Sequence, residues 1–500
     1  MKSMEPRFRS ATSARRPPLP AAALKIAIVG GGCVGLVSAA CFAQLGHVVV
    51  AVDADRERVA RLSRGDVPLH EKDLGNMVVA LIGVGRLSFT NDVAQALRDV
   101  DLVFVAVGTP TRVDGSTDTR ALDEVLRLVA LSVQEPCVVV IKSTVPVGTA
   151  QALQARLNGA CVAGDRPVRV LSNPEFLREG SAVADFMAPE RIVIGDDDAA
   201  PAARQVLMDA YAPLVAAGVP VLTMDTRSAE LSKLVANAAL AMRISFVNEI
   251  ASIASATGAD IERVCEGIGS DRRIGREFLS AGVGYGGPGL PQDIAALRET
   301  ARRHNLRSDL LLATERVNDR QRCWAFNELQ RDMGSRSRLR HLRIAVWGLA
   351  FKPGTDDVRA APAFLLIDRL LGAGVRVVVY DPVAMDNARA VLGAQRHVEW
   401  AASAAAALRG ADALMLITEW PEFVVFDPTA AARALRLKTV YDGRNALDAR
   451  RWAAAGVHVA QVGKSPAVVP LRTLHLTLAT TSQPEGEAPA ATDAGLHVAA

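Results

Sequence analysis

The sequence has few aromatic residues and little net charge. Aromatic side chains make up only 4% of the 500 residues, so Ala, Leu and Val must fill the core. The net charge of +3 is too small to indicate nucleic-acid binding. Much of that charge lies in the first 23 residues, and the rest of the chain is close to neutral. We therefore expect a globular protein with no nucleic-acid partner.

Cysteine pairs and long apolar runs are also absent. The six cysteines lie at positions 33, 41, 137, 161, 265 and 323, without C-x-x-C spacing, so we expect neither a metal site nor a disulfide framework. No apolar run reaches the ~20 residues of a membrane span. The basic N-terminus has no apolar segment before Pro17, unlike a secretory signal. These absences predict a cytoplasmic protein that does not bind membranes.

Strand and helix patterns alternate along most of the chain. Residues 24–29 (LKIAIV) and 47–52 are expected strands with a helix at 34–45 between them, and further strands are expected at 101–107, 137–143 and 168–172. A second series of strands is expected at 342–348, 375–381, 413–418 and 438–443. Between the two series, at about 213–330, strand signals vanish, and residues 227–257 predict one long helix. The fold class is therefore α/β, with two Rossmann-like, doubly wound parallel-sheet domains joined by a long central helix.

Domain limits follow from this pattern. We expect domains at 24–212, 213–330 and 331–465. A basic leader (1–23) and a Pro/Ala/Glu-rich tail (466–500) should be disordered.

A glycine cluster follows the first strand. Gly30, Gly32 and Gly35 fit G-x-G-x-x-G, which permits a tight turn, close approach to a pyrophosphate and close helix packing. Asp53 ends the second strand, where a carboxylate can bind ribose hydroxyls and repel a 2′-phosphate. The alternative is a Gly-rich turn with an Asp helix cap. The combination favours NAD.

Three polar turns follow further strands, at 107–111, 142–149 and 172–180. Doubly wound sheets place ligand crevices at these strand ends. Thr144 offers a hydroxyl group, and Glu175 a carboxylate that could act on a proton. Each turn alone could be an ordinary β–α connection, but three on one edge favour a site.

These segments resemble the UDP-glucose/GDP-mannose dehydrogenase family over residues 24–463. The resemblance is carried by SNPEFLREG (172–180), SAELSKLVANAALAMRISFVNEI (228–250), GVGYGG (282–287), GLAFKPGTDDVR (348–359) and DGRN (442–445). It implies that C6 of a nucleotide sugar is oxidised from alcohol to acid with two NAD molecules in turn, through a cysteine thioester. The segment DIAAL (293–297) favours UDP-glucose as substrate and UDP-glucuronate as product. By this resemblance the first domain would bind NAD and the third would bind the UDP-sugar. The central domain would form the dimer interface and contribute part of the substrate site.

The resemblance also implies residue roles. The cofactor residues would be Gly30, Gly32, Val34, Gly35, Asp53, Arg58, Thr109, Thr144, Glu179 and Arg359. The substrate residues would be Glu175, Phe176, Leu177, Lys233, Asn237, Arg273, Tyr285, Gly286, Phe351, Lys352 and Arg444, with Arg273 reaching a neighbouring subunit. The catalytic residues would be Thr144, Glu175, Lys233, Asn237 and Asp293, with Gly289 at the nucleophile position.

The nucleophile itself is missing. The family loop reads G-[FY]-G-G-S-C-F-P-K-D, whereas this chain has Pro288, Gly289 and Gln292 at the Ser, Cys and Lys positions. Glycine has no side chain, so no covalent intermediate can form there. Cys265, Cys33 and Cys323 are poor substitutes, since Cys265 is expected to be an inert thiol inside a helix.

Three functions remain open. The first is a working dehydrogenase, limited to the alcohol-to-aldehyde step or oxidising an aldehyde hydrate slowly. The second is a catalytically silent homologue that binds NAD or UDP-sugar as a regulator or mixed-oligomer partner. The third, weaker one is a hydroxyacid or hydroxyacyl dehydrogenase on the same two-lobe plan. Product analysis separates them, because the product would be an acid, an aldehyde or nothing.

Overall fold

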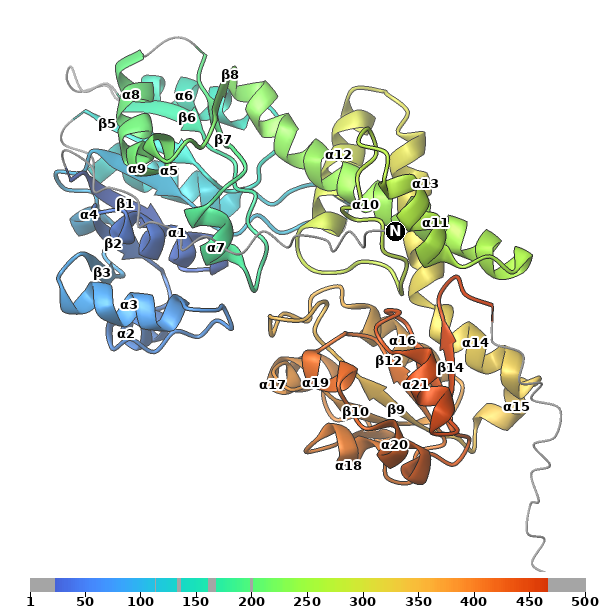
Figure 1. The fold of residues 1–500 in the computed structure, drawn as a ribbon. Coiled ribbons are helices and arrows are strands. Elements are labelled where there is room, and N and C mark those ends of the chain that lie inside the picture. The colour runs from blue at the N-terminus through green and yellow to red at the C-terminus, as the bar shows by residue number, and fades with distance from the viewer. Residues whose placement is uncertain (1–22, 113, 133–135, 161–167, 198–200, 466–500) are drawn as a thin grey trace, which may run out of the picture. The chain divides into compact units, whose positions relative to one another are not determined.

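The computed structural model describes residues 23–112, 114–132, 136–160, 168–197 and 201–465, and these contain two sheets (Figure 1). The first sheet has the strand order β3 (Leu87–Thr90), β2 (Val48–Val52), β1 (Lys25–Val29), β4 (Leu102–Val105), β5 (Cys137–Ile141), β6 (Val168–Ser172), β7 (Ile192–Gly195) and β8 (Val221–Met224). Its first six strands are parallel, whereas β7 meets β6 antiparallel and β8 runs parallel to β7. The leader (1–23) and the tail (466–500), apart from residue 23, lie outside the described residues.

Helices cover both faces of the first sheet. Alternate residues of β1 enter different cores: Ile26 and Ile28 on one face, Ala27 and Val29 on the other. The first core includes α1 (Cys33–Gln44), α3 (Leu74–Gly83), α7 (Ala182–Met187), α8 (Pro201–Ala210) and α9 (Ala212–Ala216). The second includes α4 (Val93–Ala96), α5 (Arg120–Ser132) and α6 (Thr149–Ala160), while α2 (Arg56–Ser63) follows β2. The doubly wound arrangement predicted from strand–helix alternation is confirmed.

The second sheet is parallel throughout. Its strand order is β11 (Val398–Trp400), β10 (Arg376–Tyr380), β9 (Arg343–Trp347), β12 (Ala413–Leu416), β13 (Thr439–Asp442) and β14 (His458–Gln461). Around it lie α16 (Pro362–Gly372), α17 (Met385–Leu392), α18 (Ala404–Leu408), α19 (Pro421–Val424), α20 (Pro428–Ala434) and α21 (Ala449–Ala454). Because all four strands predicted for this region exist, the expectation of a second α/β sheet is confirmed.

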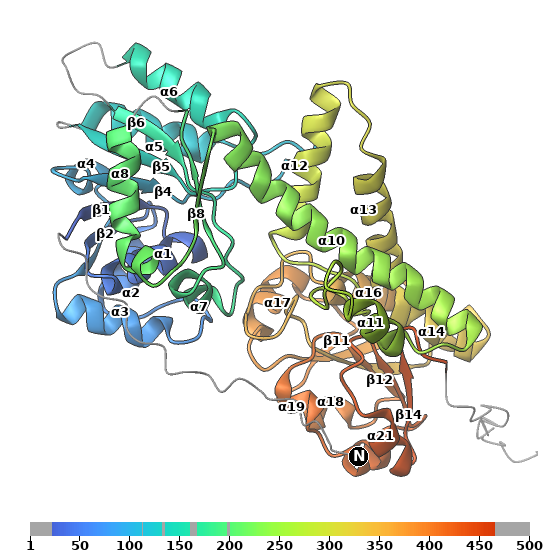
Figure 2. The ribbon, with the colours of Figure 1, turned by 45° about the horizontal axis from the view of Figure 1, so that its top comes forward.

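A helical segment joins the sheets. The long helix α10 (Thr226–Thr257) starts at Asp225, whose side chain accepts a hydrogen bond from the Ser228 N–H, and ends at Gly258, which has φ +83°. It contacts α11 (Ile261–Gly269), α12 (Leu290–Arg303) and α13 (Asp309–Arg322), and α14 (Trp324–Met333) and α15 (Arg336–Leu339) follow (Figure 2). The long helix is therefore confirmed. The expectation that strands vanish between 213 and 330 is wrong at β8, a four-residue edge strand too short to show a clear periodicity.

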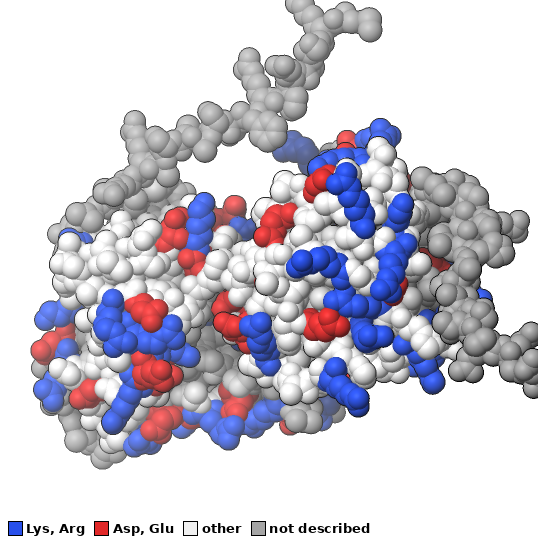
Figure 3. All heavy atoms as spheres, turned by 90° about the horizontal axis from the view of Figure 1, so that it is seen from below, with Lys and Arg blue, Asp and Glu red and all other residues white. Residues whose placement is uncertain are grey.

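The helix α10 exposes several large apolar side chains, and charges of both signs lie elsewhere on the surface. By length and composition alone α10 could cross a membrane, but a core helix of a soluble protein passes the same test, and α10 buries both Glu230 and Lys233. On the face drawn in Figure 3, acidic and basic side chains are interspersed. Ion pairs such as Arg343 with Glu399 (2.7 Å) join side chains of opposite charge. Length and composition are therefore only weak evidence that α10 crosses a membrane.

Candidate active site

The glycine turn after β1 has the backbone of a phosphate-binding turn. Gly30 has φ +119°, a conformation that L side chains rarely adopt. A side chain at Gly35 would collide with the carbonyl oxygen of Gly30, so only glycine lets α1 start so close to the turn. Gly32 precedes α1 without a side-chain cap, which leaves the first N–H groups of the helix, including that of Val34, without intrahelical partners. Such a helix start attracts anions.

Asp53 lies beside this turn. Its Oδ2 accepts hydrogen bonds from the Gly31 N–H (2.8 Å) and the Arg58 guanidinium (3.2 Å). Gly31, Gly32 and Arg58 also line a hollow of about 290 Å³. The glycine turn and Arg58 therefore line one hollow, and Asp53 joins them through its hydrogen bonds to Gly31 and Arg58.

The second sheet has a similar glycine turn and aspartate, but the aspartate is buried and fully hydrogen-bonded. Gly348 (φ +93°) follows β9 as Gly30 follows β1, and Asp381 follows β10 as Asp53 follows β2. Asp381 accepts hydrogen bonds from the N–H groups of residues 349, 350, 383 and 384, and from Trp420 Nε1 (3.0 Å). Because it is 1% exposed and already bonded to five donors, Asp381 has no free capacity for a ribose. Of these two glycine turns, the one in the first sheet suits a dinucleotide.

Four predicted catalytic side chains meet between α10 and the edge of the first sheet. Lys233 Nζ lies 3.0 Å from Glu175 Oε1, and both side chains are largely buried. One helical turn further along α10, Asn237 Nδ2 donates to Asp293 Oδ2 (2.5 Å). The spacing of four residues places Lys233 and Asn237 on one face of α10, as the sequence predicted.

Burial gives this cluster unusual electrostatics. Asp293 is 2% exposed, and burial raises its pKa to about 6, with Lys233 and the Asn237 hydrogen bond acting in the opposite direction. A carboxylate with such a pKa can take up a proton near neutral pH. Next to Glu175, the Phe176 ring lies 5.6 Å from Lys233 Nζ, and the Leu177 N–H donates to Glu175 Oε2 (2.6 Å). Glu175 and Phe176 therefore lie against the ammonium group, and Leu177 holds the Glu175 carboxylate.

The nucleophile position lies directly beside the cluster. Gly289 precedes α12, and a Cβ atom built there would meet only Asn237 Nδ2, at 3.5 Å. Gln292, at the position of the family lysine, instead donates to the backbone carbonyl of Thr109. The Thr109 hydroxyl group donates in turn to the Thr144 carbonyl (2.7 Å). Space for a Cβ atom exists at position 289, but the chain provides no thiol there.

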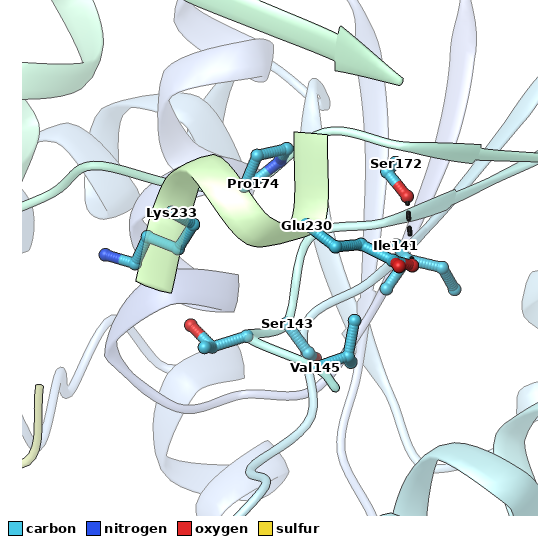
Figure 4. A pocket seen from close by; sticks show the side chains of 8 residues that line it. Ile141, Ser143, Val145, Ser172, Pro174, Glu230 and Lys233 are labelled. Atoms are coloured by element: carbon cyan, nitrogen blue, oxygen red, sulfur yellow. Dashed lines mark hydrogen bonds between the residues drawn. The ribbon is translucent and has the colours of Figure 1, made fainter. Parts of the chain in front are cut away.

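A cavity of about 10 Å³, enough for roughly one water molecule, lies under the cluster and is drawn in Figure 4. Thr144, Pro174, Glu230 and Lys233 are among its lining residues. Glu230 accepts hydrogen bonds from the backbone N–H groups of Gly148 (2.6 Å) and Ala150 (2.8 Å). These bonds attach α10 to the start of α6 and thereby set the position of Lys233 at the sheet edge.

Two further cofactor candidates, Glu179 and Arg359, meet although they follow strands of different sheets. Arg359 Nη2 donates to Glu179 Oε1 (3.2 Å) and also pairs with Asp357. Burial raises the pKa of Glu179 to about 7, and the nearby Asp357 carboxylate adds to that effect. Lys352 is also largely buried, and burial lowers its pKa, while Glu179 acts in the opposite direction. The segment 352–359 thus meets the turn that follows β6.

Arg444 is hydrogen-bonded to the loops that contain the remaining substrate candidates. Its guanidinium donates to the carbonyls of Gly284 (3.0 Å), Ile417 (2.7 Å) and Phe351 (3.4 Å). The neighbouring Tyr285 is buried, with its backbone N–H and carbonyl both bonded to Asn318. A side chain at Gly286 would collide with the carbonyl of residue 360. The loop 284–287 is therefore packed tightly against residues 351–361.

One predicted residue lies apart, and two buried groups were missed. Arg273 is 89% exposed at its side chain and pairs only with Asp271, so it touches no other predicted site residue within the described chain. Glu71 accepts from the Gly180 N–H (2.6 Å) beside Glu179. Lys142 lies beneath the cluster and donates to Asn173. Glu71 lies in none of the predicted motifs, and Lys142 was predicted only as the first residue of the polar turn at 142–149, because charged residues carry no sign of burial in sequence.

The described cysteines do not replace the missing nucleophile. Cys265 lies within α11 and is 6% exposed, and burial raises its pKa. This confirms the prediction of a buried thiol inside a helix. Burial also raises the pKa of Cys33, at the start of α1, to about 12, and Cys323 lies between α13 and α14. A high pKa disfavours the reactive thiolate.

Comparisons with known proteins agree over almost the whole described chain. Residues 24–215, 227–320 and 345–449 match the NAD binding, central and UDP binding domains of the UDP-glucose/GDP-mannose dehydrogenase family. The UDP-glucose 6-dehydrogenase of Pseudomonas aeruginosa is 43% identical over 451 residues, covering 88% of this chain and 98% of that protein. That of Rhizobium meliloti is 41% identical, covering 88% and 100%. The structure of a UDP-glucose dehydrogenase from Pyrobaculum islandicum matches with a TM-score of 0.81 at 37% identity, covering 90% and 99%.

Proposed function

The chain belongs to the UDP-glucose/GDP-mannose dehydrogenase family, and we propose that it oxidises C6 of UDP-glucose with NAD and stops after the first two-electron step. The observation that carries the proposal is an intact Lys233–Glu175 and Asn237–Asp293 cluster beside a glycine at position 289. The cluster suits proton removal, whereas the glycine provides no nucleophile for the later covalent step.

The turn in the first sheet suits NAD, which supplies a hydride acceptor when bound. Gly30, Gly32 and Gly35 would admit the pyrophosphate, and Asp53 with Arg58 would hold the adenosine ribose. Glu179 and Arg359 would lie near the other end of the cofactor. Because a carboxylate repels a 2′-phosphate, Asp53 favours NAD over NADP.

The substrate would place its sugar between α10 and the turn after β6. Lys233 would stabilise negative charge on the C6 oxygen as its proton leaves, and the Asn237 amide would orient that oxygen. Glu175, bonded to Lys233, or Asp293, with its pKa near 6, would receive the proton. Lys352 and Arg444 would hold the nucleotide, with Tyr285, Gly286 and Phe351 packed beside them.

The second oxidation lacks its usual chemistry. Without a thiol at 289, no thiohemiacetal or thioester can form there. Gln292 is neutral and donates to Thr109, so it cannot provide a cation for an oxyanion. The same observation favours the runner-up, a silent homologue that binds ligands without turnover. Release of the aldehyde is therefore the proposed end point.

We further propose a homodimer formed through α10. Five exposed apolar side chains lie on that helix: Leu231, Val235, Met242, Phe246 and Ile253. Their spacings of four and seven residues place them within an arc of about 60° at 100° per residue. A continuous apolar stripe on a helix favours a partner surface. A second copy would also give the exposed Arg273 a site to reach.

The catalytic part of the proposal is tested with UDP-glucose carrying deuterium at C6. Purified protein, NAD and this substrate should give deuterated NADH, because the first hydride leaves from C6. An absorbance increase at 340 nm with mass analysis of the nicotinamide detects it. Tight binding of both ligands without NADH formation would replace the proposal with the silent homologue.

A further inference from the structure

The Lys142 ammonium is buried in an apolar part of the first sheet's core. The residue follows β5 and is 4% exposed, and its Nζ lies 6.0, 5.7 and 5.9 Å from the ring centroids of Phe104, Phe186 and Tyr211. Within the described part of the chain, no carboxylate lies at ion-pair distance from it. Burial lowers its pKa to about 8.

A buried charge of this kind is weak evidence for a role in stability. Removing an ammonium from water is costly unless a good partner compensates for it, and replacing buried charges with apolar side chains of similar size is often neutral or stabilising. The rings supply cation–π attraction, but a methionine would also pack against them. The retained charge therefore calls for another reason.

Hydrogen bonds hold Lys142 to Asn173, which lies two residues before Glu175 of the catalytic cluster. Its Nζ donates to Asn173 Oδ1 (3.0 Å) and Tyr211 OH (3.2 Å), and Tyr211 OH donates to the same Asn173 oxygen (2.7 Å). Asn173 Nδ2 donates to the carbonyl of Val193 (2.8 Å), so its side chain is held on both sides. Two residues later comes Glu175, the partner of Lys233.

Electrostatic interactions also connect Lys142 with the Glu175–Lys233 pair. The charged and titratable groups that face the Lys142 ammonium are Glu175, Lys233, Cys41 and Tyr211. Glu175 attracts the Lys142 charge and Lys233 repels it. The Glu175 carboxylate therefore interacts with one ammonium through direct contact and with another from the core side of the sheet.

We propose that Lys142 is a positioning residue, whose buried ammonium holds the 173–175 turn and so places Glu175 and Lys233 against the sugar of the substrate. This inference rests on the proposed function, since it takes the Glu175–Lys233 pair as the sugar-contacting group. Lys142 itself touches no substrate.

The test compares Lys142→Met with Lys25→Met, a control at an exposed lysine on β1 of the same sheet. Calorimetric titration with UDP-glucose and with UDP separates the sugar from the nucleotide. Lys142→Met should weaken UDP-glucose binding by about tenfold, the size of one lost charge-assisted hydrogen bond, and leave UDP binding unchanged. Its urea midpoint should equal or exceed that of the natural chain, and the control should match the natural chain in both ligands.

A pH profile separates positioning from packing. Because the Lys142 pKa is about 8, UDP-glucose affinity of the natural chain should decline above that pH, and Lys142→Met should lack the decline. Equal loss of UDP and UDP-glucose binding, a lowered urea midpoint, or unchanged sugar affinity would each overturn the proposal. A natural chain that binds UDP but not UDP-glucose would overturn the proposed function, and this inference with it.

Discussion

Rebuilding the nucleophile loop should convert the two-electron reaction into a four-electron one. The change is the triple variant Pro288→Ser, Gly289→Cys, Gln292→Lys, which restores a hydroxyl group, a thiol and a cation at family spacing. Gly289 has φ −82° and ψ −70°, a right-handed conformation open to any L residue. Its new Cβ would meet Asn237 Nδ2 at 3.5 Å, an ordinary contact. A side chain there should therefore change stability by no more than about 0.4–1 kcal/mol, in the stabilising direction.

The chemistry should change far more than the stability. With a thiol beside Asn237 and Asp293, the aldehyde can form a covalent adduct that is oxidised and then hydrolysed. The NADH yield should rise from one to two per sugar, and the product should become UDP-glucuronate. Gln292→Lys replaces the amide that donates to the Thr109 carbonyl with a cation that favours the thiolate.

Product mass after incubation with excess NAD measures the outcome. The matched control is Pro288→Ser, Gly289→Ala, Gln292→Lys, which has the same loop without sulfur and should still stop at the aldehyde. Iodoacetamide should abolish acid formation by the cysteine variant, whereas Cys265 and Cys33 should react slowly because burial raises the pKa of both. A cysteine variant that folds and binds NAD but forms no acid would refute the reasoning that the rest of the site is ready for catalysis.

The NAD, pH and dimer proposals each give a further prediction. Asp53→Ala should weaken NAD binding by about tenfold or more through loss of charged hydrogen bonds, and unchanged affinity in calorimetry would contradict the cofactor assignment. Burial raises the pKa of Asp293 to about 6, so the native protein keeps a proton that the unfolded chain loses above about pH 3.9. Urea titrations give the free energy of unfolding of the natural chain and of Asp293→Asn. The value for the natural chain should fall relative to that of the variant between these two pH values, and the two should run parallel above pH 6. A constant difference at all pH values would count against the raised pKa. Phe246→Asp should give a monomer in analytical ultracentrifugation, whereas Val425→Asp, at an exposed position away from α10, should not; a natural chain that is itself monomeric would exclude the dimer.

Strand and helix periodicity predicted most of the fold because parallel sheets bury nearly continuous apolar runs. The strand expected at 168–172 and the helix expected at 227–257 agree with β6 and α10 within a residue. The four-residue edge strand β8 and the antiparallel pairing of β7 were not predicted. Short edge strands have little periodicity, and strand direction depends on contacts that are distant in sequence.

The site was predictable where chemistry depends on local spacing. Gly30 and Asp53 lie at fixed offsets from strands, and Lys233 and Asn237 share a helix face by their spacing. The contact of Gln292 with Thr109 joins residues 183 positions apart, so no local pattern could reveal it. The burial of Lys142 was equally hidden, because it depends on three aromatic rings from distant parts of the chain.

The most direct test of the central claim is the stoichiometry of the natural chain. Pure protein is mixed with excess NAD and a known amount of UDP-glucose, and an aldehyde-trapping hydrazine is added before mass analysis. The account predicts one NADH per sugar and a trapped C6 aldehyde of UDP-glucose. Two NADH per sugar with UDP-glucuronate as product would contradict it, because the loop at Gly289 would then not be disabled.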